Sequence, residues 1–514
     1  MTRKAYFLTV FSFLIIIAVT CSVILDGCKG HPAGTRYVLT GDTIVDGKNL
    51  VQQNCAKCHS LVPVNALTKD VWKFHTLPLM SKYVGITYYM NGYYKRDSSG
   101  LTLLEWQNIQ SYYQKVAPDS LPKAKKPIEA QNDWAGFLLK KPGPVKDVAY
   151  TTLATIDPFN HKIYTADGVS HMLQEWGADL KPERSINLPS PAVNASFAKD
   201  EKGSTSMTIS CIGQLDPVDF PNGKVINLKF EGDKLTPGVL ASEVPRAVQA
   251  VQADFNKDGL VDWIVLGQGY LKGGVTLFRQ NKDKSYQTIN VSNKPGAVKE
   301  VTGDFNNDGW TDLMVLFGRG DESLILFLND QHGNFTERQL LRFQPVYGST
   351  DFALTDLDKD GNPDLVYTCG FNYNESRILK PYHGLYVYRN TGNWNFKQEW
   401  FYPVNGCTKL VTADFNGDGK LDIMTSAFFA DLKNNPAESC IYFEQDKPFS
   451  FKPHNIPVSK YGRWMNMDVG DYNNDGRPDV ILANYSTGFN FQNGLKQFWD
   501  KNTPFILLQN NFKR

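Results

Sequence analysis

Cysteine and histidine residues in one short stretch have the spacing of a covalent cofactor site. Cys55, Cys58 and His59 form a C-x-x-C-H pentad, the pattern of c-type haem attachment. Two thiols at this spacing can add to both vinyl groups of one haem, and the adjacent imidazole then serves as the proximal iron ligand. A zinc site would need a second Cys/His pair at ligand spacing, and a thioredoxin-like pair would need a βαβ context. Neither follows the pentad, so covalent haem is the prediction.

Amphipathic segments flank the pentad on both sides. The stretch that leads into it has apolar residues at helical spacing, namely Ile44, Val45, Leu50 and Val51. Residues 101–116, LTLLEWQNIQSYYQKV, repeat apolar residues at three- and four-residue steps and predict a second amphipathic helix. With the pentad between these helices, residues 42–120 resemble small cytochromes c. The resemblance implies a small all-α domain whose haem is held between an N-terminal and a C-terminal helix.

A distal iron ligand is expected between the two helices. Met80 and Met90 are the only methionines there, and His75 is the only histidine outside the pentad. Residues 67–85, LTKDVWKFHTLPLMSKYVG, resemble the cytochrome c segment in which L-P-x-M follows a Trp-bearing helix, and the resemblance implies Met80. Met90, His75 and an open iron site remain alternatives. Ligation by His and Met raises the reduction potential and suits electron transfer, whereas an open site suits ligand binding or redox catalysis.

A second motif recurs five times in the C-terminal part of the chain. The pattern D-x-[DN]-x-D-G-x-x-D begins at residues 254, 304, 356, 414 and 471, so successive copies are 50, 52, 58 and 57 residues apart. Self-similarity at this period predicts a β-propeller or another repeat array. Strand-like runs separated by turns surround each copy, which predicts four strands, or one blade, for each repeat.

Oxygen-bearing side chains occupy fixed positions in these loops. Positions 1, 3, 5 and 9 are Asp or Asn, a backbone carbonyl is expected near position 7, and Gly at position 6 permits a sharp turn. Calcium accepts roughly six to eight such oxygens, so we expect up to five structural Ca²⁺ ions. The loop opens like an EF-hand loop but lacks its Glu at position 12 and its flanking helices. The candidate ligands are Asp254, Asn256, Asp258, Asp262, Asp304, Asn306, Asp308, Asp312, Asp356, Asp358, Asp360, Asp364, Asp414, Asn416, Asp418, Asp422, Asp471, Asn473, Asp475 and Asp479.

The loops and the strands that follow them resemble FG-GAP and VCBS repeats, as in the propeller of integrin α chains. Two further units, in residues 151–176 and 192–213, keep the strand pattern without the acidic loop. Seven blades of an all-β propeller are therefore predicted over residues 148–514. The chain ends just after a third strand of the last blade, so a strand from elsewhere must complete the ring. Residues 143–148 are the expected source.

Polar side chains recur on what should be the innermost strand of each blade. Five residues before each first Asp stand Gln249, Lys299, Asp351, Lys409 and Asn466. Arg246 and Arg463 precede two of them by three residues. Around a propeller axis these side chains would line the central channel, either as an ordinary water-filled pore or as a site for a polar or anionic ligand. The chain has neither a G-x-S-x-G elbow nor an H-E-x-x-H helix, so catalytic residues are not assigned and enzyme activity stays open.

The N-terminus has the features of an export signal. MTRK supplies positive charge, and the apolar segment after it is long enough to span a bilayer as an uncleaved anchor. The sequence LDGC at residues 25–28 resembles the lipobox of bacterial lipoproteins, although Asp26 is unusual there. The resemblance implies a signal peptide of residues 1–27 and lipidation of Cys28, with a plain signal peptide or anchor as the alternative. We expect an exported protein, periplasmic or anchored in the outer membrane by lipid, with the cell surface as a further location.

The rest of the chain divides into a tether at 28–41, the cytochrome c domain at 42–120, a Pro- and Lys-containing linker at 121–147 and the propeller at 148–514. The apolar stretch 132–139 inside the linker is expected to pack against another part of the protein, with the haem domain as a candidate. Four cysteines remain in the propeller, and they predict either two disulfides or buried thiols: Cys211, Cys369, Cys407 and Cys440. If disulfides form, a Cys369–Cys407 bridge is favoured.

The charge balance narrows the function. With 54 basic and 53 acidic residues and a net charge of +1, the chain has no long-range field that would hold nucleic acid. The leading hypothesis is an exported haem c electron-transfer protein whose calcium-binding propeller docks a redox partner protein or a ligand. One alternative is a propeller oxidoreductase that passes electrons from a small molecule or sugar to its own haem. The other is an adhesion or carbohydrate-binding propeller in which haem is ancillary.

Overall fold

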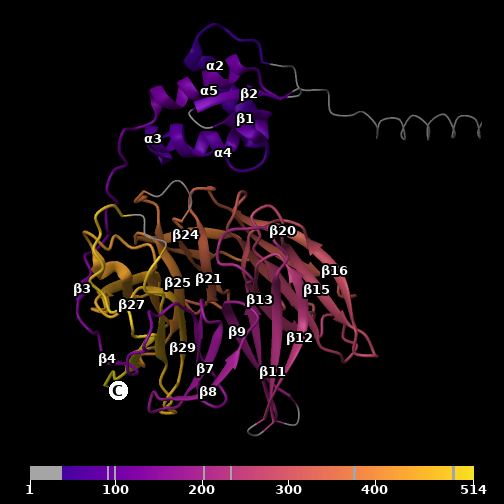
Figure 1. Ribbon diagram of the computed structural model, residues 1–514, viewed down its shortest axis with the longest axis vertical. Helices are drawn as coiled ribbons and strands as arrows, with labels where there is room; N and C mark the ends of the chain where they lie inside the picture. Colours follow the sequence, from indigo (N-terminus) through magenta and orange to yellow (C-terminus); the bar gives the residue numbers. More distant parts are fainter. Residues whose placement is uncertain are drawn as a thin grey trace, which may run out of the picture.

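The computed structural model describes residues 37–89, 92–97, 100–200, 203–231, 234–373, 378–488 and 492–513. The expected signal peptide, the lipidation site Cys28 and the alternative iron ligand Met90 lie outside the described residues. Figure 1 shows a small N-terminal helical unit above a large β-propeller. Along the described part of the chain, no helix is both long and apolar enough to cross a lipid bilayer.

The N-terminal helical unit, residues 37–117, is built around two helices. They are α2 (Thr43–Asn54) and α5 (Leu103–Val116). Between them lie short helical segments and a hairpin: η1 (Cys55–Lys57), η2 (Val64–Ala66), α3 (Lys69–Val71), η3 (Trp72–Thr76), α4 (Leu77–Ser81), η4 (Lys82–Val84), β1 (Ile86–Tyr89) and β2 (Tyr93–Arg96). Both predicted helices are confirmed. The expectation of an all-α unit is wrong, because β1 and β2 pair as an antiparallel two-stranded sheet.

Local sequence sets the ends and the crossing of the two long helices. Asp42 caps α2 by accepting hydrogen bonds from two backbone N–H groups of its first turn. Thr102 and Glu105 form a capping box at the start of α5. Gly47 lets α2 approach α5 closely, since a Cβ at Gly47 would lie 2.2 Å from the backbone oxygen of Asn108. The apolar faces of both helices share one core with Leu67, Trp72 and Ile86.

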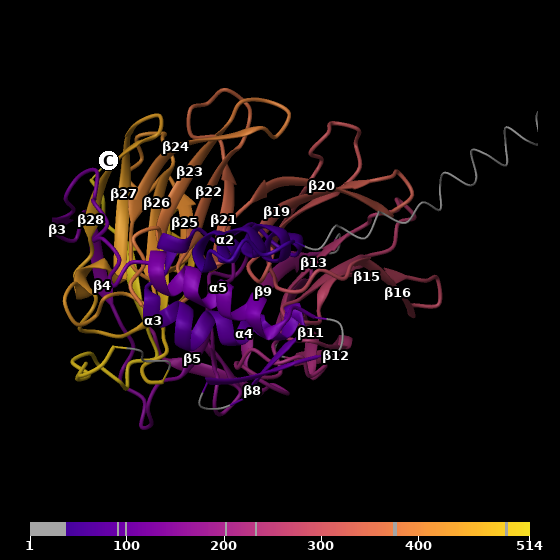
Figure 2. The ribbon, with the colours of Figure 1, turned by 90° about the horizontal axis from the view of Figure 1, so that it is seen from above.

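Seven sheets form the propeller, six of four antiparallel strands and one, in blade 6, to which a fifth short strand is added, so the predicted blade count is confirmed. Blade 1 contains β5 (Thr151–Ile156), β6 (Ile163–Asp167), β7 (Met172–Trp176) and β8 (Pro182–Asn187). Blade 2 contains β9 (Ala192–Lys199), β10 (Thr205–Cys211), β11 (Gly223–Glu231) and β12 (Lys234–Val244). Blade 3 contains β13 (Ala247–Ala253), β14 (Asp262–Gly267), β15 (Gly274–Gln280) and β16 (Tyr286–Ser292). In each of these blades the first strand is innermost, as Figure 2 shows from above.

The remaining blades repeat this order. Blade 4 contains β17 (Ala297–Gly303), β18 (Asp312–Phe317), β19 (Ser323–Asn329) and β20 (Phe335–Arg342). Blade 5 contains β21 (Ser349–Thr355), β22 (Asp364–Cys369), β23 (Gly384–Asn390) and β24 (Phe396–Pro403). Blade 6 contains β25 (Cys407–Ala413), β26 (Asp422–Ala427), β27 (Cys440–Lys447) and β28 (Ser450–Asn455). Blade 7 takes β29 (Trp464–Gly470), β30 (Asp479–Asn484) and β31 (Phe505–Asn510) from the C-terminus.

A strand from the N-terminal side completes blade 7, as expected, but it is not residues 143–148. β4 (Phe137–Lys140) pairs antiparallel with β31, and β3 (Gln131–Asn132) pairs parallel with β28 of blade 6. The apolar stretch 132–139 therefore packs inside the propeller rather than against the helical unit. Its Phe137 ring lies edge-on to Phe415 and Tyr442. The position is explained by burial, because Phe137 fills the core between blades 6 and 7.

The second strand of each repeat is the most buried part of its blade. All six residues are buried in each of β14, β18, β22, β26 and β30, which reflects packing on both faces between adjacent blades.

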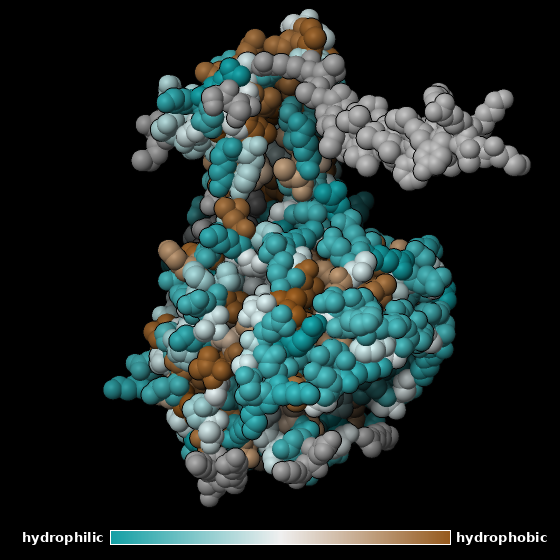
Figure 3. Space-filling view, turned by 90° about the vertical axis from the view of Figure 1, so that its right-hand side faces the viewer, coloured by the Kyte–Doolittle hydropathy of each residue, from teal (hydrophilic) through white to brown (hydrophobic). Residues whose placement is uncertain are grey.

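The four propeller cysteines lie in the buried interior as free thiols: Cys211, Cys369, Cys407 and Cys440. The favoured Cys369–Cys407 disulfide is therefore wrong, and the alternative of buried thiols is confirmed. The propeller face seen in Figure 3 is mostly hydrophilic, with scattered hydrophobic patches.

Blade 5 carries the helical unit. Val346 lies in the connection from blade 4 to blade 5, and Ile378 lies in the β22–β23 connection of blade 5. Both pack against the core of the unit. Tyr382 donates a hydrogen bond from its hydroxyl to the backbone oxygen of Ala66 at 3.0 Å. In Figure 2 the unit lies across the end of the propeller, over the inner strands of several blades. The unit is thus held at the end of the channel by one blade.

Candidate functional site

The C-x-x-C-H pentad lies where α2 ends. Cys55 begins the short helical turn η1, Cys58 follows this turn, and His59 comes directly after it. Cys55 is half-buried and packs at the edge of the unit's core, whereas Cys58 is exposed. The two thiols are free, so no disulfide joins them. The two cysteines and the histidine of the pentad therefore lie directly after the end of α2.

A backbone contact orients the imidazole of His59. Its Nδ1 lies 2.8 Å from the backbone oxygen of Ser60. Because a carbonyl oxygen only accepts, Nδ1 must carry the hydrogen, and the neutral ring then has its lone pair on Nε2. Metal-binding histidines use this arrangement, in which the second nitrogen donates to a carbonyl and fixes the tautomer. His59 thus fits the role of an axial iron ligand.

The electrostatics of Cys55 argue against thiol redox chemistry. Burial raises the pKa of the Cys55 thiol to about 11, and the neighbouring Cys58 adds to the rise. Reactive cysteines need the opposite, a lowered pKa that makes the thiolate available at neutral pH. The pair therefore differs from a thioredoxin-like dithiol, while covalent attachment of a cofactor needs no lowered pKa in the finished protein.

The candidate distal ligands occupy one helical stretch. Met80 lies on α4 and is half-buried, whereas His75 lies on η3 and is exposed. Thr68 caps this stretch by accepting from the backbone N–H of Val71, and the Trp72 indole donates to the backbone oxygen of Val64 at 2.8 Å. The assignment of Met80 to iron stays a prediction.

The acidic loops of blades 3 to 7 connect the first and second strands and share one geometry. In every loop the Asp at position 1 accepts from the backbone N–H groups of positions 5 and 6, at 2.7 to 3.1 Å. The Gly at position 6 has a positive φ in all five, for example +82° at Gly259. These bonds fold each loop into a tight turn before any ion is considered.

The Asp at position 9 joins the loop to the blade. One of its carboxylate oxygens accepts from a backbone N–H near the end of the third strand, and the other accepts from the backbone N–H of position 2 of the loop. In blade 3 the donors to Asp262 are Gln280 and Phe255. The same pair of bonds recurs in the other four loops. Burial raises the pKa of this carboxyl in every loop, to about 6 for Asp364 and Asp422 and about 7 for Asp479, and neighbouring aspartates raise it further.

Two observations test whether the loops fit a cation. In blade 3 the side-chain oxygen of Asn256 is buried and finds no hydrogen-bond partner within the described part of the chain, while its amide nitrogen donates to Asp258. In blade 5, carboxylate oxygens of Asp356, Asp358 and Asp364 lie within 4.8 Å of one another. A side-chain oxygen without a hydrogen-bond partner and three converging carboxylates are the kind of oxygen ligands that Ca²⁺ binds. The residues present therefore fit the ion.

The blade 5 loop differs from the others in its own counter-charge. It has Asp358 where four loops have Asn, and the guanidinium of Arg389 lies 2.8 Å from Asp358 and 3.2 Å from Asp360. Arg389 thus offsets part of the extra negative charge. Sequence reasoning missed it, although an Arg on the third strand of the one four-aspartate repeat was a visible signal.

The acidic loops also join neighbouring blades. The backbone oxygen of position 2 accepts a side-chain hydrogen bond from the next blade: Phe255 from Asn329, Phe305 from Trp394, Leu357 from Gln445 and Phe415 from Asn510. At the closure of the ring, His161 of blade 1 donates from Nδ1 to the backbone oxygen of Asp471 at 2.6 Å. Each loop is therefore part of a blade interface, which favours a structural role.

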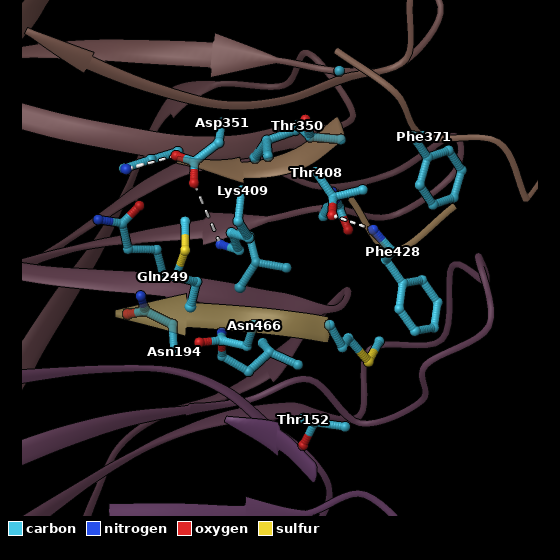
Figure 4. Close-up of a pocket in the computed structure, with 18 of the residues that line it drawn as sticks. Thr152, Asn194, Gln249, Thr350, Asp351, Phe371, Thr408, Lys409, Phe428 and Asn466 are labelled. Carbon is cyan, nitrogen blue, oxygen red and sulfur yellow. Dashed lines mark hydrogen bonds and ion pairs between the residues drawn. The ribbon is translucent and has the colours of Figure 1, made fainter. Parts of the chain in front are cut away.

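The predicted channel residues line one cavity of about 370 Å³ at the propeller axis, as expected. Gln249, Lys299, Asp351, Lys409 and Asn466 each directly follow a β-bulge of the innermost strand, and bulges re-aim side chains. Figure 4 shows Gln249, Asp351, Lys409 and Asn466 converging, with Phe371 and Phe428 toward one end. The sequence pattern therefore identified these residues and Arg246 correctly as channel lining, but not Arg463.

Most of these polar groups are satisfied by one another. Lys299 and Lys409 lie 2.6 and 3.8 Å from the two carboxylate oxygens of Asp351. The Gln249 amide exchanges two hydrogen bonds with the backbone of Glu300 in the next blade. The middle of the channel thus ties inner strands together. Arg463, predicted to face the mouth, instead lies over the Phe428 ring and donates to the backbone oxygens of Phe428 and Gly488.

Comparisons with known proteins agree with the repeats. A family model described as FG-GAP-like repeat matches residues 254–315, 304–367 and 378–425. The chain carries FG-GAP-like repeats within a seven-bladed propeller. No curated protein matches it.

Several solved structures align with the chain at low identity. The N-terminal domain of Nup159 is 12% identical, with a TM-score of 0.43, over 75% of this chain and 98% of that one. BBS1N in complex with ARL6DN is 10% identical, with a TM-score of 0.45, over 73% and 97%. Virginiamycin B lyase from Staphylococcus aureus is 9% identical, with a TM-score of 0.46, over 72% and 99%. Similarities this weak carry no argument about function.

Proposed function

We propose that this chain is an exported electron-transfer protein that carries one covalent haem c on its N-terminal helical unit. The propeller would hold a partner protein or a ligand beside the haem. The observation that supports the proposal best is the pentad itself, in which two free thiols and a histidine with a fixed tautomer follow one another at the end of α2. A bound haem would supply one-electron transfer at its iron.

The haem-binding residues and the core residues of the helical unit have separate roles in this proposal. Cys55 and Cys58 would hold the haem through thioether bonds, and His59 and Met80 would be the ligands of its iron. The core residues beside Cys55, among them Trp72 and Tyr113, would exclude water from the attachment site. Burial of the haem in such surroundings sets its reduction potential together with the axial ligands.

Calcium and lipid complete the proposal. The acidic loops would each hold Ca²⁺ through side-chain oxygens of positions 1, 3, 5 and 9, and the ion would neutralise the carboxylates that burial brings together. Lipid on Cys28 would anchor the exported protein to the outer membrane, and this part rests on the LDGC sequence alone.

The haem is tested by producing the full chain in bacteria that attach haem to proteins covalently. We expect pigment that stays with the polypeptide after denaturation, and loss of that pigment in the Cys55→Ser, Cys58→Ser double variant. Cys440→Ser is the matched control, because Cys440 is a free thiol far from the pentad in the propeller interior. Colourless wild-type protein from a competent host would contradict the proposal.

A second candidate function is favoured by the position of the channel. Phe371 and Tyr373 line the cavity, and the same β22–β23 connection carries Ile378 and Tyr382, which contact the helical unit. A small molecule bound in the channel would therefore lie near the proposed haem. In this function the molecule is oxidised, its electrons pass one at a time to the haem, and its protons leave to solvent. Reduction of the haem by an added small molecule, without a partner protein, would distinguish this function from simple electron transfer.

A further inference from the structure

In blade 3 an arginine has the left-handed backbone that three other blades give to glycine at the equivalent position, whereas Arg463 at that position of blade 7 has no positive φ. The residue before the innermost strand is Gly296, Gly348 and Gly406 in blades 4, 5 and 6, with φ of +82°, +65° and +63°. In blade 3 the residue is Arg246, with φ of +53°. The backbone oxygen accepts the same bond in each case, from Gln268 to Arg246 as from Gly318 to Gly296. The positions are therefore equivalent.

This conformation is unfavourable for arginine. A left-handed backbone costs a residue with a Cβ roughly 1–2 kcal/mol relative to the ordinary helical region, and such strain concentrates at functional sites. Glycine would remove the strain, and three blades use it. Arg246 thus keeps a strained backbone. What blade 3 gains over the blades with glycine is an arginine side chain at this place.

The guanidinium of Arg246 is placed where its hydrogen-bond donors have no partner. The residue is 6% exposed and lines the channel cavity, and its Nε and Nη1 are buried without a hydrogen-bond partner among the described residues. A buried donor that lacks a partner loses the full free energy of its hydration. A ligand that accepts these hydrogen bonds would recover it.

A second arginine faces the same space from the next blade. Arg319 also lines the cavity, and its Nε is likewise buried without a partner. Its guanidinium lies between the rings of Tyr270 and Phe371, at 5.6 and 5.5 Å from their centroids. Gly296 makes room for it, since a Cβ at Gly296 would lie 2.5 Å from the Arg319 Cβ. The position of Arg319 is therefore fixed by aromatic stacking and by a glycine.

The two cations act on each other. Burial lowers the pKa of Arg246 to about 10, and the charge of Arg319 lowers it further, while Asp216 partly opposes this. Burial also lowers the pKa of Arg319, against Tyr270, Glu322 and Asp219. Asp216 accepts from the Tyr373 hydroxyl, and Asp219 accepts from two backbone N–H groups, so both carboxylates already have other partners. An anion between the guanidinium groups would relieve their repulsion.

Apolar side chains line the cavity together with polar ones such as Gln268, Thr350 and Thr408. The apolar ones form the walls considered next. They are Leu215, Pro217, Phe371, Phe428, Phe429 and Met465. A cavity of about 370 Å³ is within the range of small-molecule sites, which are mostly apolar with a few convergent polar groups. Inorganic anions would satisfy the arginines but leave these walls without contact. A carboxylate on an apolar body would satisfy both.

We propose that Arg246 and Arg319 bind the carboxylate of a small organic acid whose apolar body packs against the aromatic side chains at this end of the channel. The inference rests on the ligand-binding part of the proposed function and names its chemical class. It does not depend on the haem, so the two parts fail separately. Coloured protein that binds no acid would overturn this inference alone, and colourless protein that binds the acid would overturn the haem alone.

The test is titration calorimetry of the full chain with benzoate, benzamide and inorganic phosphate. We expect benzoate to bind, benzamide to bind at least tenfold more weakly because it lacks the charge, and phosphate to bind at least tenfold more weakly because it lacks the apolar body. Equal affinity for benzamide would overturn the role of the arginines. Equal or tighter binding of phosphate would overturn the role of the aromatic walls, and no binding of benzoate would overturn the proposal.

Arg246→Gly supplies a test that does not depend on a loss alone. Because glycine suits the backbone at this position, the variant should melt at the same temperature as the wild type or higher, while benzoate affinity falls at least tenfold. Arg319→Gln should weaken the binding of benzoate without relieving any backbone strain. If Arg246→Gly instead melts lower and binds benzoate normally, Arg246 is a structural residue and the proposal fails.

Discussion

The hydroxyl of Tyr382 in the propeller donates to the backbone oxygen of Ala66 in the helical unit at 3.0 Å. On the far side of the same short segment, the Trp72 indole donates to the backbone oxygen of Val64 at 2.8 Å. The segment η2 is therefore held from both sides, by the core of the unit and by blade 5. The contact therefore joins the core of the helical unit to the β22–β23 connection of blade 5.

Replacing Tyr382 by Phe should loosen the helical unit without unfolding it. A hydrogen bond of this kind contributes about 1 kcal/mol net, so we expect faster hydrogen exchange in residues 64–66 and an unchanged melting temperature of the propeller. Tyr93→Phe is the matched control, because Tyr93 is 64% exposed on the hairpin of the unit. Identical exchange in both variants would show that the contact does not hold the unit.

Replacing Met80 by Ala should remove the weak long-wavelength absorption band that sulfur–iron ligation gives to the oxidised haem. Loss of the thioether should also lower the reduction potential, because methionine ligation raises it. Covalent pigment should remain, since Cys55 and Cys58 are untouched. Met90→Ala is the control, and loss of the band in that variant instead would assign the ligand to Met90.

Removing calcium should destabilise the propeller and leave the haem spectrum unchanged. Each loop that binds the ion only in the folded state adds about 2.7 kcal/mol when free calcium is about 100 times the dissociation constant. Chelation should therefore lower the melting temperature of the propeller, and added Ca²⁺ should restore it. Asp356→Asn should reduce the effect, whereas Asp283→Asn, in a hairpin turn outside the loops, should not. A melting temperature unaffected by chelator would contradict structural calcium.

In chelator, the stability of the propeller should fall as pH rises through the neutral range. Folding raises the pKa of Asp364 and Asp422 to about 6 and that of Asp479 to about 7, so the folded chain binds these protons more tightly than the unfolded chain does. This contribution is fully present below the unfolded value of about 3.9 and is lost as pH rises through 6 to 7. Burial raises the pKa of Glu438 to about 7, which acts in the same direction.

Thermal unfolding across this pH range measures the effect. Calcium should flatten or reverse the fall, because the ion replaces the protons as the partner of the ionised loops. Asp479→Asn should reduce the slope in chelator by about the contribution of one group. A stability that rises with pH in chelator would contradict the raised pKa values.

The sequence predicted the blades well because their signals are local and repeated. The acidic loops located the first and second strands of five blades, and the fixed offset of Gln249 and its counterparts from the loops located the channel lining. The two degenerate blades followed from their strand patterns alone. Likewise, the spacing of apolar residues identified α2 and α5, whose mutual packing closes the core of the helical unit.

Features that depend on distant partners were not predictable. Which strand completes blade 7 depends on how well Phe137 fills the gap beside Phe415 and Tyr442, and nothing near Phe137 in the sequence indicates this. The state of Cys369 and Cys407 depends on the packing of separate strands. Arg246 and Arg319 face the same cavity from neighbouring blades and are 73 positions apart in the sequence. The sequence did contain one signal, an arginine in blade 3 at the position where blades 4, 5 and 6 have glycine.

The pairing of β3 and β4 with the last two blades has a consequence for how far the helical unit can travel. Only residues 118–130 connect the unit to chain that is fixed in the propeller. Fully extended, such a segment reaches about 45 Å, so a unit released from blade 5 would stay within a short radius of its landing place. Its local concentration there would be on the order of millimolar. Undocking and redocking would then be a unimolecular equilibrium, insensitive to dilution and set by the strength of the contact at Tyr382.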